Sequence, residues 1–360
     1  MQLLQDFLDR SKQLNRTPCH PRDLPYHGPN KKYKIIHQAL TIPNLPAPLH
    51  YLNFFTLLGQ PNIPMLRNPS AIETSNLDTA TVLASCSAHM VGQLNHYSID
   101  QDCFIDKTDF HFSDREQLLG NTSKFRLFRD DSELSFDIYI RTYPIASHML
   151  NLRFALAEHW SMPCHCRGTV QYKHQRYQIQ HIGNFDFARS IHFPYVSYAF
   201  LSYQMIHVSK NRQIIFCQIR DKLNHIVQSR IFLRDLNQMQ NLMLDENVEF
   251  RIQRIYPCVI TPNGQRMHLV REFEWDYQSD DLTIRMQAKS RGDYKFGLAA
   301  GYVGSFQYQI QINNEHENGE SGYCEYIDCR ELCYQEQSEQ QFDTPKMQFS
   351  QAFARKEHTK

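Results

Sequence analysis

Apolar and polar side chains alternate with a period of two in many runs between residues 79 and 330. The clearest runs are residues 136–141, 248–253, 282–289 and 306–312, where every second side chain is hydrophobic. Successive side chains of a strand point to opposite faces, so each run predicts a strand with one buried face and one wet face. That arrangement is typical of antiparallel sheets. We therefore expect an all-β, mostly antiparallel fold.

Turn sequences separate these runs, for example Ser209–Arg212 and Thr261–Gly264. Asparagine, glycine and serine at such places favour tight turns. Strands joined in series in this way favour a β-barrel or a sandwich. One helix is expected to interrupt them, because Asp235 is placed to cap a helix that carries apolar residues from Leu236 to Met243.

Two stretches of the chain resemble each other. Gly168–Tyr172 and Gly304–Tyr308 both read glycine, small hydroxyl residue, apolar residue, glutamine and tyrosine. Each stretch crosses a polar turn and returns through a glycine followed by an acid and an aromatic residue, where the acids are Asp186 and Glu325. The sequence therefore predicts that one β unit occurs twice.

The separation between the copies is as long as a domain. It is nearly the same whether it is measured from Gly168 to Gly304 or from Asp186 to Glu325. Such a separation indicates two domain-sized units, because solenoid repeats have much shorter periods of roughly 20–50 residues. Residues 151–156 also resemble residues 283–288. We expect a first β domain over residues 70–192 and a second over residues 193–334.

The N-terminal segment, residues 1–69, has a different character. Leu3, Leu4, Phe7 and Leu8 predict a short amphipathic helix. Ten of the sixteen prolines then lie between residues 18 and 69, which predicts an extended, proline-rich arm over the surface. The apolar stretch of residues 49–58 is expected to pack or pair with a barrel.

The polar tail, residues 335–360, is rich in glutamine, glutamate and serine, which favours disorder. Acidic and basic residues balance at 38 each, so no overall charge attracts nucleic acid or an anionic membrane. No apolar stretch approaches the roughly 18 residues of a membrane span. The N-terminus lacks a secretory signal, so we expect a cytoplasmic protein whose ten cysteines are reduced.

The order of several motifs resembles that of the tandem lipocalin-like family of the hydroxyneurosporene synthase (carotenoid hydratase) type. That family closes its second half with a glycine-rich hairpin and a final G-x-G-Y-x-E strand, approximated here by Gly301–Phe306 and Gly319–Tyr326. Its second half opens with a strand pair that matches Tyr203–His207 and Gln213–Arg220. The resemblance covers about residues 80–330. Within the family the chain looks most like a bacterial branch for which the family supplies no function.

The resemblance implies two lipocalin-like barrels with a pocket in or between them. In enzymatic members of the family, an acid near the end of the first half protonates an isoprenoid double bond, and Asp186 occupies that position. Asn184 and Ala188 stand where the family has tryptophan and glutamate. The motif is therefore incomplete, and catalysis does not follow from it alone.

Asp186 is the candidate catalytic acid. It lies between Phe185 and Phe187, and strand alternation points its side chain away from both. If it is buried, desolvation raises the pKa of a carboxyl group and suits it to acid catalysis. It could instead face solvent or pair with Arg189. Glu325 is its counterpart in the second copy, where a structural salt bridge is the alternative.

Four residues are candidate ligand contacts: Phe185, Phe187, Tyr323 and Glu325. For the aromatic residues, ordinary packing is the alternative. We expect no metal and no cofactor. His159 with Cys164, His165 and Cys166 lacks the paired ligand spacing of a zinc site. The glycine-rich residues 297–304 lack the βαβ context of a dinucleotide loop.

Three functions remain open from the sequence. The first is binding of a hydrophobic small molecule of isoprenoid, fatty acyl or steroid-like type, since small barrels hold such ligands. The second is a hydratase, cyclase or isomerase that uses Asp186 as an acid. The third is a non-enzymatic interaction protein in which the proline-rich arm engages a partner.

Overall fold

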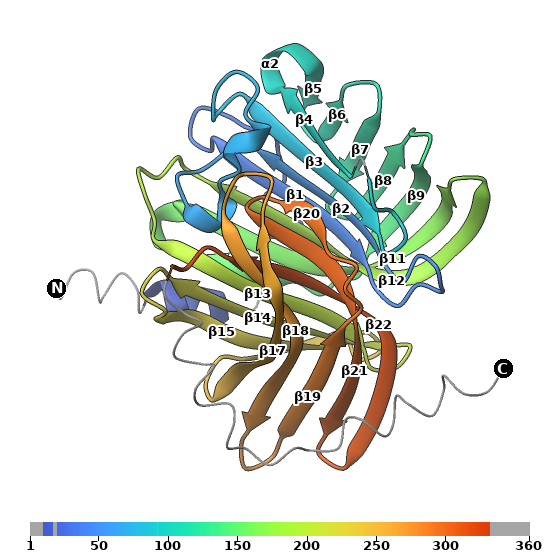
Figure 1. Ribbon diagram of the computed structural model, residues 1–360, viewed down its shortest axis with the longest axis vertical. Coiled ribbons are helices and arrows are strands. Elements are labelled where there is room, and N and C mark those ends of the chain that lie inside the picture. Colours follow the sequence, from blue (N-terminus) through green and yellow to red (C-terminus); the bar gives the residue numbers. More distant parts are fainter. Residues whose placement is uncertain (1–9, 17–19, 92, 332–360) are drawn as a thin grey trace.

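The computed structural model describes residues 10–16, 20–91 and 93–331 of the 360-residue chain. These residues form two antiparallel sheets, one of 12 strands and one of 10. Figure 1 shows the blue-to-green first sheet above the yellow-to-red second sheet. The chain completes the first sheet at residue 190 and starts the second at residue 198. The expected antiparallel β fold with two barrel-like or sandwich-like halves is confirmed.

The first sheet has the strand order β4-β3-β2-β1-β12-β11-β9-β8-β7-β6-β5, and β10 pairs with β11 beside this path. Its first strand therefore lies next to its last. The strands are β1 (Ile35–Ile42), β2 (Leu52–Leu58), β3 (Thr79–Cys86), β4 (Leu94–Ser98), β5 (Cys103–Asp106), β6 (Asp109–Phe112), β7 (Glu116–Asn121), β8 (Lys124–Arg129), β9 (Leu134–Thr142), β10 (Ser147–Asn151), β11 (Ala157–Tyr172) and β12 (Gln175–Ser190).

The second sheet follows the same plan, in the order β16-β15-β14-β13-β22-β21-β19-β18-β17, with β20 paired to β21. Again the first strand of the sheet pairs with the last. The strands are β13 (Tyr198–His207), β14 (Arg212–Asp221), β15 (Ile226–Asp235), β16 (Gln240–Leu244), β17 (Val248–Ile260), β18 (Arg266–Gln278), β19 (Thr283–Ser290), β20 (Lys295–Leu298), β21 (Gly301–Ile312) and β22 (Glu315–Asp328).

Helices are short throughout the described part of the chain. Residues 10–16 are helical, while residues 1–9, which carry most of the predicted N-terminal helix, lie outside the described residues. The other helices are η1 (Pro21–Asp23), η2 (Pro64–Leu66), η3 (Pro69–Ala71), α2 (Ile99–Asp102) and η4 (Arg153–Ala155). No described helix has the length and hydrophobicity needed to cross a bilayer. The predicted polar tail also lies outside the described residues.

Part of the expected proline-rich arm lies inside the first sheet. The apolar stretch that we expected to pair with a barrel forms β2, which pairs with β1 and β3. β1 itself is central, because it lies between β2 and β12. The sequence between Pro29 and Pro43 contains no proline, so this strand keeps every backbone donor. The prolines fall in the connections instead. Residue 70, the predicted start of the first β domain, lies in the connection between β2 and β3 of this sheet.

Burial follows the predicted alternation. In β9, Phe136, Ile138 and Ile140 are at most 3% exposed, whereas Tyr139 between them is 57% exposed. The inward faces of the two sheets form two separate hydrophobic cores. Outward-facing residues of β1 and β2, among them Ile35 and Phe55, belong to the core of the second sheet. The second sheet therefore covers the outside of the first at these strands.

The predicted helix after Asp235 is wrong, because residues 236–239 form the turn between β15 and β16 and residues 240–243 belong to β16. The Asp235 carboxylate accepts hydrogen bonds from the backbone N–H groups of Asn237 and Gln238, both at 2.9 Å. An aspartate makes the same contacts in a turn as at a helix N-cap. Met239 then adopts a left-handed backbone with φ of 52°, which ends any helical path.

The matching motifs fall in the corresponding strands but not at equivalent places. Gly168 lies near the end of β11, which finishes at residue 172. Gly304 instead lies in the first half of β21, which continues to residue 312. The resemblance between residues 151–156 and 283–288 is also not structural, because the first segment is mainly a turn with η4 and the second is strand β19. The acids agree better, since both Asp186 and Glu325 pair with the first strand of their sheet.

Buried polar contacts join the two sheets. Arg234 of β15 is 1% exposed and donates hydrogen bonds to Ser147 (2.9 Å), Ser161 (2.9 Å) and Asn184 (2.6 Å) of the first sheet. In the opposite direction, the Asn53 side chain of β2 donates to the Tyr323 hydroxyl at 2.8 Å. These contacts fix the relative position of the sheets around the space between them.

Candidate functional site

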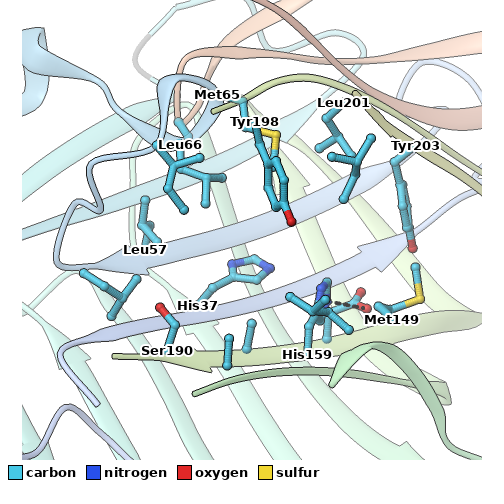
Figure 2. Close-up of a pocket in the computed structure, with 18 of the residues that line it drawn as sticks. His37, Leu57, Met65, Leu66, Met149, His159, Ser190, Tyr198, Leu201 and Tyr203 are labelled. Atoms are coloured by element: carbon cyan, nitrogen blue, oxygen red, sulfur yellow. Dashed lines mark ion pairs between the residues drawn. The ribbon is translucent and has the colours of Figure 1, made fainter. Parts of the chain in front are cut away.

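A cavity of about 270 Å³ lies between the two sheets. Both sheets line it, together with the segment that leads into η2, and most of the lining side chains are apolar. The apolar lining includes Leu57, Met65, Met149, Leu201, Ile219 and Leu298. Figure 2 shows Leu57, Met65, Met149 and Leu201 projecting into one space with a smaller number of polar groups. An apolar space with few polar groups is typical of a small-molecule site.

The first sheet contributes polar groups from its outward face. His37 of β1, His159 of β11 and Asp186 of β12 all line the cavity. They lie on neighbouring strands, where Asp186 pairs with Ala39 and Ser161. Because their chain neighbours on the opposite face fill the core of the first sheet, alternation directs these three side chains toward the second sheet.

The second sheet contributes Tyr198, Tyr203 and Glu325. Tyr203 of β13 and Glu325 of β22 are direct cross-strand partners. In Figure 2 the rings of both tyrosines enter from the strand opposite His37 and His159, and their hydroxyl groups point toward the histidines. Polar groups from both sheets therefore meet in the same space.

Asp186 is 5% exposed and faces this cavity. Its Oδ2 atom accepts a hydrogen bond from the Asn184 side chain, and its Oδ1 atom lies 3.5 Å from His159 Nε2, the contact dashed in Figure 2. Arg189 pairs instead with Glu158 at 2.9 Å. The suggested alternatives for Asp186, exposure to solvent or pairing with Arg189, are therefore both wrong.

Glu325 is held differently. Its Oε1 atom accepts a hydrogen bond from the Tyr323 hydroxyl at 2.9 Å, and none of the described residues forms an ion pair with it. Burial raises the pKa of the Glu325 carboxyl to about 8; the Tyr323 hydrogen bond opposes this change, and the nearby charge of Asp186 adds to it. The suggested salt bridge at Glu325 is wrong, and this carboxyl is largely protonated at neutral pH.

His37 lines the cavity from the outward face of β1. Burial, together with the nearby His159, lowers its pKa to about 4, so the ring is neutral at pH 7. The His37 Nδ1 atom lies 2.9 Å from the Thr56 carbonyl. Because a carbonyl only accepts, Nδ1 carries the hydrogen and Nε2 remains an acceptor.

The structure brings together only two of the five predicted site residues, Asp186 and Glu325. Phe185 and Phe187 are fully buried on the opposite face, where they pack against Trp160 in the core of the first sheet. Tyr323 is also fully buried and is not part of the lining, although it donates to Glu325.

Sequence reasoning missed His37, Tyr203 and, as a cavity residue, His159. The hydrophobic alternation of residues 35–42 was available as a signal for His37, because it places the ring on the face opposite Ile36. No local pattern distinguishes Tyr203 from other strand tyrosines. Among the described residues, no three histidine, cysteine or acidic side chains gather closely enough to hold a metal ion.

Comparison with known proteins supports the fold. The model of a family of unknown function (DUF6670) matches residues 55–341. No curated protein matches the sequence. A Nitrosomonas europaea protein provisionally assigned as AttH has a similar structure, with a TM-score of 0.58 and 13% identity over 82% of this chain and 93% of that chain.

Kievitone hydratase from Nectria haematococca is also similar, with a TM-score of 0.50 and 12% identity over 82% of this chain and 89% of that chain. At these identities the similarity is one of fold. The chain therefore shares the lipocalin-like fold that we expected. The narrower assignment to the hydroxyneurosporene synthase type stays a prediction.

Proposed function

This chain belongs to DUF6670, a family of unknown function, and we propose that it binds a largely apolar small molecule in the cavity between its two sheets. The observation that carries the proposal is the cavity itself, whose lining is mostly apolar and comes from both sheets. Ligand sites occur preferentially at such interfaces between structural units. Isoprenoid, fatty acyl and steroid-like molecules are the matching ligand classes.

The binding experiment uses N-phenyl-1-naphthylamine, an uncharged probe that fluoresces in apolar surroundings. We expect saturable binding of one probe per chain. In the variant Ala188→Phe, the new ring projects into the cavity, because Ala188 lines it, and the affinity falls at least about ten-fold. The matched control is Gln180→Phe on the same strand, which is exposed and lies outside the cavity, so its affinity stays within about two-fold.

Equal affinity in both variants would place the probe elsewhere, and absence of binding to the unaltered protein would remove the proposed function. Native mass spectrometry of gently purified protein gives a second readout. A bound apolar molecule released by solvent extraction, and lost in Ala188→Phe, supports the site and names its chemical class.

Acid catalysis is the second candidate function, as in a hydratase, cyclase or isomerase. The presence of two carboxyl groups in one apolar cavity favours it. Glu325 still holds a proton to donate at neutral pH, because burial raises its pKa to about 8. This reverses the roles that we expected, in which Asp186 was the acid. A carbocation formed by proton transfer would then lie near Asp186, which suits stabilisation of positive charge.

Turnover of an extracted ligand distinguishes binding from catalysis. Glu325→Gln removes the transferable proton and keeps the shape of the side chain, so we expect product formation to fall at least about a hundred-fold, while probe affinity changes less than about three-fold. Normal turnover in this variant would exclude Glu325 as the acid. The third possibility, a partner engaged by the proline-rich arm, has no support from residues 35–58, most of which are buried in the first sheet.

A further inference from the structure

One end of the cavity contains polar atoms that lack hydrogen-bond partners. Within the described part of the chain, no group hydrogen-bonds to the Tyr203 hydroxyl, to Asp186 Oδ1 or to His159 Nε2, and the last two atoms face each other at 3.5 Å without forming a hydrogen bond. Tyr203 is 6% exposed and Asp186 is 5% exposed. Figure 2 shows the Tyr203 hydroxyl entering the same end of the cavity as Met149 and His159, and the Asp186 charge is close enough to raise the pKa of Tyr203. The three unpartnered atoms therefore share one region.

Their positions come from three strands and from both sheets. Tyr203 lies on β13, Asp186 on β12 and His159 on β11. Asp186 is held by the Asn184 side chain, which is in turn bound by Arg234 of the second sheet. The direction of the Asp186 carboxylate is thus fixed by buried neighbours, and its Oδ1 atom stays directed into the cavity. The folded protein keeps these buried polar atoms without hydrogen-bond partners, although each such atom lowers the free energy of unfolding.

The chemistry of these atoms restricts what can fill the space. The Tyr203 hydroxyl is a donor, since burial raises its pKa and keeps it protonated. Asp186 Oδ1 is an acceptor, and the unprotonated Nε2 of the neighbouring His37 is a second acceptor. A matching ligand must accept one hydrogen bond and donate another. A hydroxyl group does both.

Other head groups match less well. A hydrocarbon leaves all of these atoms without partners, which costs the affinity that the hydrogen bonds would have supplied. A carboxylate has no hydrogen to donate to the acceptors, and its charge would lie beside the Asp186 carboxyl group. A ketone accepts from Tyr203 but gives nothing to the acceptors.

Resting on the proposed function, that the cavity binds an apolar molecule, we propose that its ligand is an apolar alcohol. The single hydroxyl lies between Tyr203 and Asp186, where it accepts from the first and donates to the second. The hydrocarbon part lies against Leu57, Met65 and Leu201. The two sheets therefore recognise different parts of one hydroxyl group, and neither sheet forms the site alone.

The test compares 1-decanol, decane and decanoate as competitors of bound N-phenyl-1-naphthylamine at pH 7.5. 1-Decanol and decane differ in the free energy that each needs to leave water. The affinity of each ligand is therefore compared between the unaltered protein and the variants, and the two ligands are not compared with each other. We expect Tyr203→Phe to weaken 1-decanol about ten-fold and to leave decane within about two-fold. Decanoate is expected to bind the unaltered protein at least about ten-fold more weakly than 1-decanol.

Tyr139→Phe is the matched control. It also removes one tyrosine hydroxyl group, but Tyr139 of β9 is exposed and lies outside the cavity. We expect this variant to bind 1-decanol within about two-fold of the unaltered protein, because its side chain does not reach the ligand.

Unchanged affinity for 1-decanol in Tyr203→Phe, or equal losses for 1-decanol and decane, would overturn the alcohol assignment and leave the apolar site intact. So would decanoate binding as tightly as 1-decanol. If the probe and all three ligands fail to bind the unaltered protein, the proposed function fails instead. The two failures are therefore distinguishable.

Discussion

Asp186 in β12 and Glu325 in β22 hold matching places in the two sheets. Each acid lies near the end of the last strand, pairs with the first strand of its sheet and faces the cavity. Each also accepts a hydrogen bond from the side chain two residues before it, which is Asn184 in one sheet and Tyr323 in the other. The shared strand order thus produces the same local geometry twice.

The two acids differ in what the opposite sheet supplies. Behind Asp186, the guanidinium of Arg234 donates to Asn184 at 2.6 Å. Behind Glu325, the neutral Asn53 donates to the Tyr323 hydroxyl at 2.8 Å. A buried charge acts strongly in a low-dielectric interior. Strand order therefore positions the acids, while the residue that reaches across from the opposite sheet is charged in one case and neutral in the other.

The largest effect is expected when the charged partner is removed. Arg234→Met leaves Ser147, Ser161 and Asn184 without their donor, and we expect the free energy of unfolding to fall by about 3–5 kcal/mol. The neutral counterpart, Asn53→Leu, removes one donor and should cost about 1 kcal/mol. Urea denaturation of both variants measures the difference. Equal decreases in the free energy of unfolding would show that the charged and the neutral cross-sheet contacts contribute equally to stability, which would contradict this prediction.

The second prediction concerns Glu325→Gln. The folded-state pKa of about 8 lies above the ordinary value of 4.5, so between these values the folded protein holds more protons than the unfolded chain. The stability of the unaltered protein therefore falls as pH rises through this window. We expect the variant to match it at pH 4.5 and to exceed it at pH 9 by about 2–3 kcal/mol, allowing for screening of a partly open side chain.

Asp186→Asn is the matched variant in the first sheet, and the opposite sign is expected. Asn184 then loses a charged acceptor, so the free energy of unfolding at pH 9 should fall by about 1–2 kcal/mol. Thermal and urea unfolding from pH 4.5 to pH 9 measure both variants. Protonation of His37 and His207, whose pKa values are lowered to about 4, weakens each of these proteins below pH 6.5. This contribution cancels for Glu325→Gln but not for Asp186→Asn, because the Asp186 charge raises the pKa of His37. The two variants are therefore compared with each other above pH 6.5. Parallel pH curves for the two variants would contradict the assignment.

The smallest effect is expected where the two sheets are most alike. Arg126 and Asp137 form an exposed ion pair between β8 and β9, and Arg285 and Asp276 form one between the corresponding β19 and β18, each at 2.9 Å. Double-mutant cycles should give about 0.2–1 kcal/mol for either pair, falling with salt. A coupling free energy well above this range in only one sheet would show that the ion pairs of the two sheets also differ in strength.

Strong alternation made most of the fold predictable. Residues 136–141 and 306–312 were placed correctly because their apolar side chains recur at every second position. The region around β1 was misread because ten prolines surround it, although none lies within the strand. The helix predicted from Asp235 failed because a capping aspartate and a turn aspartate make the same local contacts. Local chemistry was ambiguous in both cases, and pairing with neighbouring strands decided the outcome.

The candidate site was only partly predictable. Alternation correctly placed Asp186 opposite Phe185 and Phe187, because the side-chain period of a strand is fixed. Alternation gave no information about what covers the face of the strand to which the Asp186 side chain points. Solvent, a salt bridge and an apolar cavity were all compatible with the sequence. The raised pKa of Glu325 was equally inaccessible, since it depends on burial by the other sheet.

The sequence by itself determined the antiparallel strands and the face on which each side chain lies, because these follow from backbone geometry over a few residues. Only the tertiary structure decided that the outward face of the first sheet is covered by the second. That covering brings together Asp186 and Glu325, which belong to different halves of the chain. Contacts between such distant positions depend on how whole sheets pack, and no local pattern encodes them.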